Sequence, residues 1–533
     1  MKDEVWLTGE RIQPLIDRVL SLRCSDATSR EYGSFDRDYW SYRTIRGFQS
    51  APFQHVMSGF AYLQNQLLVT ENQYREIAES ALSQWIAQCN GNGSANEWYR
   101  NEQSFCATAM GLHAATETAL ILMENSGVSL PEYRLTALAR SERWLRNRSN
   151  PIAANQEIAS AVGRWNLGLL LADSLMQDAA TDSLRKSAQE LERRGYLSEY
   201  GGFDIGYSLL SLELLISPHQ AGCEVVLPIA DRICELLNGV ISGGGEFPFA
   251  LGSRGTHHPF YAGVHYFSIF SSEAERLHIN LKSDHLSDQV GYVSSYDDRY
   301  LATFGFNSIA RLIAHQQVKK SNSPSKKSNF RTSPLERIEV SGGTLFCNRS
   351  LGSGIQYLSD NHETFVHLGY SATVDGQRWC SLTAPTGDSV PPRHHLVRQS
   401  TRLPLQRFQF LFSLLQSICR IPWVARQVSL FARTELGRPS RFHSAYFIRT
   451  LEILDETLMV RDEIHSGSKS QLLSIQSLSA FPFHSPSRFA TNLLNSDACA
   501  ELQHEELTVS SSKVIRWRLD TSASPLRTSL SES

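Results

Sequence analysis

Four polar clusters hold the residue types that could carry out chemistry, and each lies at an expected helix start or in a loop. One of them reads "YGGFDIGY" and runs into the apolar stretch "SLLSLELLI". Its glycines permit positive φ and close approach of the backbone to a ligand, while Asp204 can cap the following helix. Tyr207 then lies in the first helical turn. It is a candidate proton carrier, although a buried tyrosine with a hydrogen-bonded hydroxyl would give the same pattern.

Two further clusters supply amide side chains. The sequence "NEWYRNEQSFCATAMGL" places Tyr99 and Asn101 before an apolar helix, and "NQEIASAVGRWNLGLLL" opens another helix with Asn155 and Gln156. Asparagine is also a preferred helix cap, as is Ser104 in the first of these sequences. These amides therefore either cap their helices or face a ligand.

The fourth cluster, "GGGEFPFALGSRGTHHPFYAGVHYF", is basic and aromatic. Its Arg254 lies between glycines and suits bidentate pairing with a carboxylate or sulfate. His257 and His258 are adjacent and would diverge by about 100° on a helix, so metal binding by both is not expected. The sequence has no phosphate-binding loop, nucleophile elbow or metal-ligand set, and we expect no cofactor. Together the four clusters favour an acidic polysaccharide, with aromatic side chains as walls for sugar rings.

The composition restricts the class of protein. The 533 residues have a formal charge of −3, are 41% hydrophobic and 20% charged, and show no bias toward nucleic acid. Nine cysteines without regular spacing indicate neither a zinc site nor a disulfide framework. The start "MKDEVWLTGERIQPLIDRVL" does not read as a secretory signal, so we expect a cytoplasmic protein. Nothing in the sequence indicates an oligomeric state.

The spacing of apolar residues changes along the chain, which predicts an α+β protein with two halves. Residues 1–315 repeat apolar positions at helical spacing, with too many helices for one bundle, which favours a toroid of helical hairpins. Residues 316–335 form a basic linker rich in serine and proline. Residues 336–533 alternate with period two, which predicts an antiparallel β-sandwich. A helical insert at about 402–432 interrupts the strands.

The insert contains the most apolar run of the later part of the chain, "FQFLFSLLQSICRIPWVARQVSLFA". Gln416, Arg420, Pro422 and Arg426 break this run, so a helix that spans a membrane is not expected. The alternatives are amphipathic helices packed on the protein or lying on a membrane surface.

The order of the clusters resembles the heparinase II/III-like family of polysaccharide lyases and its relatives in bacterial surface-polysaccharide gene clusters. The resemblance covers most of the chain from about residue 36. It rests on "DYWSYRTIRGF", "FQHVMSGFAYL", "NEQSFCATAMGL", "NQEIASAV", "YGGFDIGYSLLSL" and "GSRGTHHPFYAGVHYF". It implies an (α/α) toroid followed by a β-sandwich, and cleavage of uronate-containing chains by β-elimination.

The resemblance also implies roles for single residues. Tyr207 matches the family tyrosine that carries the proton, and Asn101 matches the residue that neutralises the uronate charge, with Asn155 as the alternative. The family also uses a histidine of the β domain, for which "HETFVHLGY" offers His367, preferred here, and His362. The expected substrate-binding residues are Arg254, His257, His258, Asn155, Gln156 and Tyr99.

The chain also departs from the family. The usual asparagine and histidine motifs are not reproduced as a full set, and secreted lyases carry signal peptides. One alternative is therefore a uronate epimerase, which would use the same proton abstraction without elimination. Another is a non-catalytic glycan-binding or scaffold protein of exopolysaccharide biosynthesis, held at a membrane by the basic linker and the insert.

Overall fold

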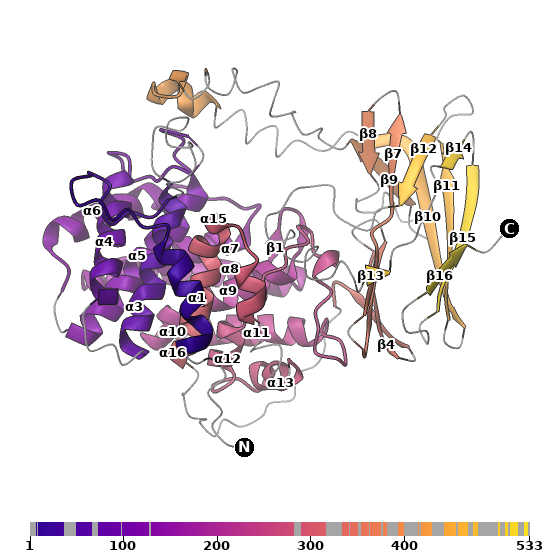
Figure 1. The fold of residues 1–533 in the computed structure, drawn as a ribbon, viewed down its shortest axis with the longest axis horizontal. Helices are drawn as coiled ribbons and strands as arrows, with labels where there is room; N and C mark the ends of the chain where they lie inside the picture. Colours follow the sequence, from indigo (N-terminus) through magenta and orange to yellow (C-terminus); the bar gives the residue numbers. More distant parts are fainter. Residues whose placement is uncertain are drawn as a thin grey trace.

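A helical first half is followed by antiparallel sheets in the computed structural model of this chain (Figure 1). This arrangement confirms a mixed helix and sheet protein. The residues that the structure describes are 7, 9–36, 50–66, 73–97, 99–126, 129–281, 289–315, 333–340, 342–349, 353–361, 363–374, 377–380, 393–398, 414, 417–428, 442–454, 457–466, 473–477, 499–500, 507–509, 512–520 and 527–530.

The helical half is built from helices of three to 22 residues. They are α1 (Gly9–Leu20), α3 (Val56–Gln66), α4 (Gln73–Gln88), α5 (Phe105–Ser126), α6 (Glu132–Arg146), α7 (Ala154–Leu170), α8 (Ser174–Arg194), α9 (Ile205–Leu214), α10 (Ile216–Gln220), α11 (Val226–Asn238), α12 (Ala262–Phe267), α13 (Ser272–Asn280), α15 (Asp298–Tyr300) and α16 (Phe306–His315). Three short segments of other helix types join them: η1 (Ala51–His55), η2 (Phe249–Leu251) and η3 (Leu301–Gly305).

Local sequence explains where several of these helices begin and end. Asp173 caps α8 by accepting from the Met176 amide, and Gly195 ends that helix with a φ of 81°. Ser271 caps α13 in the same way through the Ala274 amide. Each cap supplies a partner for a backbone group that the helix itself leaves unsatisfied.

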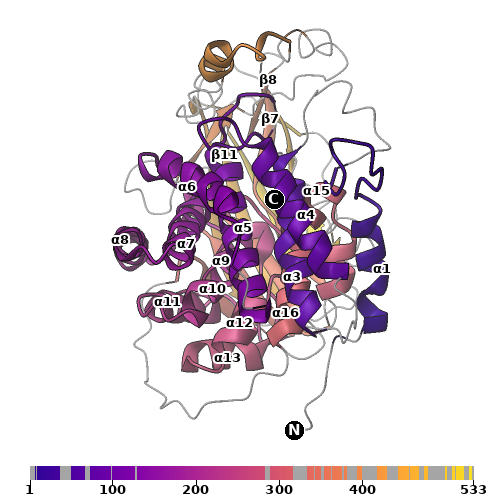
Figure 2. The ribbon, with the colours of Figure 1, turned by 90° about the vertical axis from the view of Figure 1, so that its left-hand side faces the viewer.

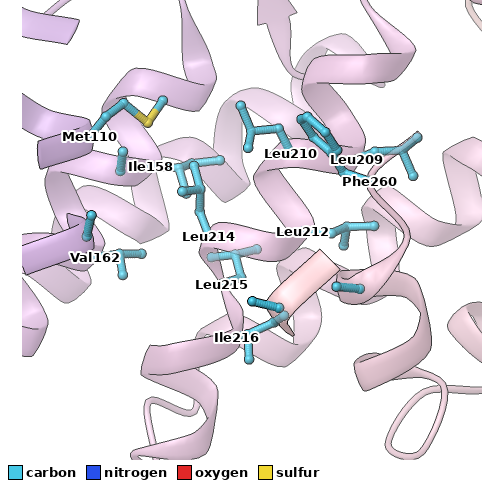
Figure 3. Close-up of a cluster of buried hydrophobic side chains, with 14 of the residues drawn as sticks. Met110, Ile158, Val162, Leu209, Leu210, Leu212, Leu214, Leu215, Ile216 and Phe260 are labelled. Atoms are coloured by element: carbon cyan, nitrogen blue, oxygen red, sulfur yellow. The ribbon is translucent and has the colours of Figure 1, made fainter. Parts of the chain in front are cut away.

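Six helices contact one another in a cyclic order. The order is α3, α5, α7, α9, α12, α16 and then α3 again, while α4 packs on α3 and α8 packs on α7 (Figure 2). The helices of this inner series are buried on nearly every side, which an outer layer of helices allows. Figure 3 shows part of their shared core, with Met110 of α5, Ile158 of α7 and Leu209 of α9. The six inner helices therefore contact one another in a closed series.

A buried network of ion pairs and a hydrogen bond joins four of the inner helices. The Arg311 side chain of α16 pairs with Glu117 of α5 at 2.5 Å and with Glu213 of α9 at 3.5 Å. The Tyr62 hydroxyl of α3 donates to Glu117 at 3.1 Å. Because charges this deeply buried need partners, the network ties the inner helices to one another.

The second half contains two large sheets. The five-stranded sheet has the order β13 (Cys499–Ala500), β6 (Thr364–His367), β5 (Gly354–Ser359), β4 (Gly343–Asn348), β3 (Glu336–Val340), and β13 is its one parallel strand. The nine-stranded antiparallel sheet has the order β14 (Leu507–Val509), β12 (Leu473–Ser477), β7 (Tyr370–Val374), β8 (Gln377–Cys380), β9 (Arg393–Arg398), β10 (Phe442–Leu454), β11 (Thr457–His465), β15 (Ser512–Asp520), β16 (Arg527–Leu530).

The five-stranded sheet is covered on both faces. One face shares a core with the nine-stranded sheet, where Tyr357 lies with Trp517 and Phe447. The other face belongs to the helical core through Phe346 and Leu358. Strands β4 and β5 are therefore buried at every position instead of alternating, unlike β11, which alternates as the sequence pattern predicts.

The predicted linker and insert fall largely outside the described residues. Helix α16 ends at His315 and β3 begins at Glu336, so the boundaries predicted for the linker stay predictions. Within the predicted insert, Leu414 and residues 417–428 are described, and helical turns lie there. One described helix is long and apolar enough to span a membrane by length and composition: the stretch Phe105–Glu124 of α5, whose apolar window is 89% buried inside the protein.

Candidate functional site

A tight hairpin and a helix cap hold Tyr207. Strand β1 (Ser198–Glu199) pairs with β2 (Gly202–Phe203), and the two residues between them, Tyr200 and Gly201, have φ of 51° and 92°. Two successive positive φ values are the signature of a narrow hairpin turn, and glycine adopts them without strain. Asp204 then accepts from the Tyr207 amide at 3.1 Å and caps α9, as the sequence predicts.

Asp204 also fastens a second segment beside this turn. Its other carboxylate oxygen accepts from the Arg254 amide at 3.0 Å and from the Thr256 amide at 3.4 Å. A side chain at Gly206 would clash with the Thr256 carbonyl, so this glycine is needed for the close approach. The two glycine-rich clusters of the sequence therefore meet around one buried carboxylate.

The phenol of Tyr207 is partly buried and protonated. Its ring meets the His258 ring edge to face at a centroid distance of 5.6 Å. Burial raises the pKa of Tyr207 well above its usual value, and the neighbouring Tyr300 and Tyr200 raise it further. Tyr207 can therefore donate a proton at neutral pH, whereas its phenolate is scarce.

His258 lies fully buried behind Tyr207. Burial lowers the pKa of His258 to about 3, so its imidazole is neutral at pH 7. The ring stacks on Phe260 at 4.7 Å, and its Nδ1 lies 3.3 Å from the Tyr296 hydroxyl. That hydroxyl donates its own proton to the His257 carbonyl at 2.7 Å, so His258 must donate from Nδ1, and its Nε2 carries the lone pair.

Arg254 places a positive charge at the same turn. Its guanidinium carbon lies 4.4 Å from the centre of the Tyr200 ring, and the side chain is exposed. The charge opposes the effect of burial on the pKa values of Tyr200, Tyr207 and Glu199. An exposed, stacked guanidinium of this kind is well suited to a carboxylate or a sulfate.

The predicted amides Asn155 and Gln156 lie at the start of α7. The Asn155 backbone N–H donates to the buried Glu199 carboxylate at 2.7 Å, while the Gln156 side chain accepts from the Asn150 side chain at 2.7 Å. Burial raises the pKa of Glu199 well above its usual value, and its bonds to Asn155 oppose that effect. Asn155 is thus joined to the Tyr207 turn through Glu199, and Gln156 is used within its own loop.

Asn101 is turned toward the insert instead of toward Tyr207. Its side-chain amide donates to the carbonyls of Cys419 and Arg420, both at 3.2 Å. Ser104, not Asn101, makes the capping bond of α5, through the Ala107 amide at 3.2 Å. The assignment of Asn101 to the uronate charge therefore has no geometric support in this structure. Tyr99, two residues earlier, is half-buried in the same loop.

His367 lies in the core between the two sheets. Its Nδ1 is 3.0 Å from the Arg449 guanidinium, and its ring stacks on Trp517 at 5.0 Å. Arg449 in turn pairs with the fully buried Asp462 at 2.7 Å. Val366, on the opposite face of β6, belongs to the helical core. The structure thus places His367 against Arg449 and Trp517, and its role beside Tyr207 stays a prediction; the alternative, His362, lies outside the described residues.

His257 packs as an aromatic side chain. Its ring lies 4.4 Å from that of Phe249 and 4.9 Å from that of Tyr292, and it is 9% exposed. Adjacent His258 points into a different environment, against Phe260, as expected for neighbouring residues. Among the described residues, no group of three histidine, cysteine or acidic side chains is placed to hold a metal ion.

Sequence reasoning missed the ion pair between Glu97 and Arg299. It joins the loop before α5 to the segment before α16, 202 residues away. Tyr300, next to Arg299, lies with its ring 5.8 Å from His258, so this pair borders the Tyr207 cluster. The charged sequence "YDDRY" at residues 296–300 was the available signal, but nothing local reveals its partner.

The chain was compared with family models, curated proteins and solved structures. No family model and no curated protein matches the sequence. Among solved structures, the fold is similar to Ara127N-Se, a GH127 β-L-arabinofuranosidase from Geobacillus stearothermophilus T6, with a TM-score of 0.34 and 10% identity. The match covers 97% of this chain and 96% of that chain. The resemblance to heparinase-like lyases is not confirmed by these comparisons.

Proposed function

We propose that the helical half is an (α/α) toroid and that the Tyr207 cluster, at one end of it, acts on an acidic glycan. The support is the position of the cluster along the chain. Glu97 precedes α5, Tyr207 lies in the first turn of α9, His258 precedes α12 and Arg299 precedes α16. The first turn of α9 and the segments before α5, α12 and α16 therefore contribute to this cluster, and the amino terminus of α9 favours an anionic ligand.

The reaction that fits this site best is β-elimination at a uronate. The proton on the carbon beside the carboxylate is lost to a base, the bond from the next carbon to the glycosidic oxygen breaks, and a carbon–carbon double bond forms. In this proposal Arg254 pairs with the uronate carboxylate and stabilises the charge that develops on it. Tyr207 gives its proton to the departing oxygen. His258 is fully buried, so we assign it the positioning of the Tyr207 ring.

The single observation that carries this proposal is that the Tyr207 phenol and the Arg254 guanidinium belong to the same turn. A protonated phenol and an exposed guanidinium meet at one turn because Asp204 bonds to the backbone amides of both residues. An acid and a carboxylate partner are two of the three groups that the elimination needs.

The test is incubation with a panel of sulfated and unsulfated uronate polymers. Elimination generates unsaturated uronate ends, which are followed by their ultraviolet absorbance. Incorporation of solvent deuterium at the uronate carbon without new absorbance would replace cleavage by epimerisation. Tight glycan binding by calorimetry, with neither signal, would support a binding protein.

A second candidate is glycoside hydrolysis, favoured by two carboxyl groups near Tyr200. Glu199 has a raised pKa through burial, while Glu97 is ion-paired with Arg299. Both influence the pKa of Tyr200 electrostatically. A protonated and an ionised carboxyl group are the pair that glycosidases use. New reducing ends without ultraviolet absorbance, abolished by Glu199→Gln, would select this candidate over elimination.

A further inference from the structure

Exposed apolar side chains are concentrated on one short segment of the insert. Ile421 is 56% and Trp423 69% exposed, and Ile418 and Leu414 are 38% and 46% exposed. These are four of the eleven large apolar side chains that are exposed among the described residues, so the concentration is local. An exposed apolar patch on the surface of a soluble protein commonly marks an interaction site.

The segment is fixed on its inner side. Cys419 and Ala425 are fully buried, and Asn101 bonds to the carbonyls of Cys419 and Arg420. The short orange helix of this segment lies at the edge of the molecule in Figures 1 and 2. The apolar residues are thus presented outward from an anchored base, instead of filling the core.

The charge of the insert identifies the kind of partner. Residues 402–432 contain four arginines and no aspartate, glutamate or lysine. Arg420 and Arg426 are exposed on the same segment as Trp423. A lipid surface accepts apolar side chains below a layer of headgroups, and anionic headgroups pair with arginines that have no acidic residues beside them in the sequence. Tryptophan is also enriched at that depth of a membrane.

We propose that Leu414 and residues 417–428 form a peripheral docking surface for an anionic lipid leaflet. Ile418, Ile421 and Trp423 enter the headgroup boundary, and Arg420 and Arg426 pair with lipid phosphates. This surface would hold the protein beside a membrane whatever reaction the Tyr207 cluster performs. The inference therefore stands or falls independently of the proposed function.

The experiment is co-sedimentation of the full chain with lipid vesicles. Vesicles of phosphatidylcholine alone are compared with vesicles that also contain phosphatidylglycerol. We expect binding to the anionic vesicles, weakened by salt and by about fivefold for each of Arg420→Ala and Arg426→Ala. Trp423→Ser should weaken it by about tenfold, because the apolar contact is lost.

Leu175→Ser is the matched control, since Leu175 is 79% exposed on α8, outside the insert. It should bind as the wild type does, and circular dichroism should show that every variant is folded. Absence of wild-type binding to anionic vesicles, or equal binding by Trp423→Ser, would overturn the proposal. It would also be overturned if Trp423→Ser dissociated an oligomer in sedimentation velocity, because the patch would then contact a second copy of the chain.

Discussion

At the scale of single residues, the Tyr207 turn depends on one carboxylate. Asp204 bonds to the amides of Tyr207, Arg254 and Thr256 while being fully buried. Asp204→Ala removes a helix cap and leaves buried amides unsatisfied, so we expect a loss of about 1–3 kcal/mol in the free energy of unfolding. Denaturant unfolding measures this loss. Asp182→Ala, in an exposed ion pair of α8, should leave the free energy nearly unchanged.

The proposed role of Tyr207 as proton donor is tested by removing its hydroxyl oxygen. Tyr207→Phe keeps the ring that meets His258 edge to face but abolishes the hydroxyl. We expect turnover on an acidic glycan to fall by about 100-fold or more, with the melting temperature nearly unchanged. Tyr133→Phe, on an exposed tyrosine of α6, should retain full turnover. Equal turnover of Tyr207→Phe and the wild type would remove Tyr207 from catalysis.

Whether a contact of a single residue could be predicted depended on how near its partner lies in the sequence. The Asp204 cap could be predicted because the acceptor and the Tyr207 amide are three residues apart. The partner of Asn101 could not, since the carbonyl of Cys419 is 318 residues away in sequence. An asparagine before an apolar helix reads as a cap or a ligand contact in either case. Only the fold shows that it anchors the insert.

At the scale of elements, the inner helices are joined by charge as well as by apolar packing. Burial raises the pKa of Glu213 to about 7, although Arg311 and the Ser308 hydroxyl lower it. For Glu117, burial also favours a higher pKa, but Arg311 lowers it below the usual value. Arg311 thus holds one carboxylate ionised, and the second carboxylate takes up a proton near neutral pH.

The raised pKa of Glu213 predicts how stability depends on pH. A carboxyl group whose pKa is about 7 when folded and near 4.5 when unfolded binds more protons in the folded state between these values. Its contribution to stability is therefore present below about pH 4.5 and is lost as pH rises toward 7. We expect Glu213→Gln to lack this loss.

The measurement is the free energy of unfolding of wild type and Glu213→Gln from pH 5 to pH 8. As pH rises, the wild type should lose free energy of unfolding relative to Glu213→Gln. Neighbouring His113 and His315 have pKa values of about 4 when folded and ordinary values near 6.5 when unfolded, so they raise stability as pH rises through this range. Their contribution is common to both proteins and cancels in the difference between wild type and variant. A difference that is constant over the whole range would contradict the assignment of Glu213.

The sequence pattern predicted the burial of some strands but not of others. The period of two predicted β11, whose burial alternates, but β4 and β5 are buried at all positions. Both faces of those strands are covered because the five-stranded sheet lies between the helical half and the nine-stranded sheet. The sequence indicates a strand there, yet a second covering layer is a property of the fold. For the same reason the sequence could not predict that His367 packs against Arg449 and Trp517.

At the scale of the whole molecule, the five-stranded sheet makes the two halves one packed body. Asn348 donates to the Leu251 carbonyl at 2.7 Å, and the Gly243 amide donates to the Thr344 hydroxyl at 3.4 Å. Phe346 and Leu358 extend the helical core into the sheet. Because the halves share buried apolar contacts, we expect them to unfold in a single transition.

Leu358→Ala tests that coupling, since Leu358 is 3% exposed on the helical face of β5. Truncating a buried leucine leaves a cavity and should lower the free energy of unfolding by about 2–5 kcal/mol. In the wild type, the helical signal in circular dichroism and the β-sheet band in the infrared amide I region should change together. In Leu358→Ala the two curves should separate, because the halves lose part of the contact that couples them. Leu175→Ala, at an exposed position of α8, is the control and should leave both curves where they are. Coincident curves at unchanged stability in Leu358→Ala would show that this face of the sheet does not hold the halves together.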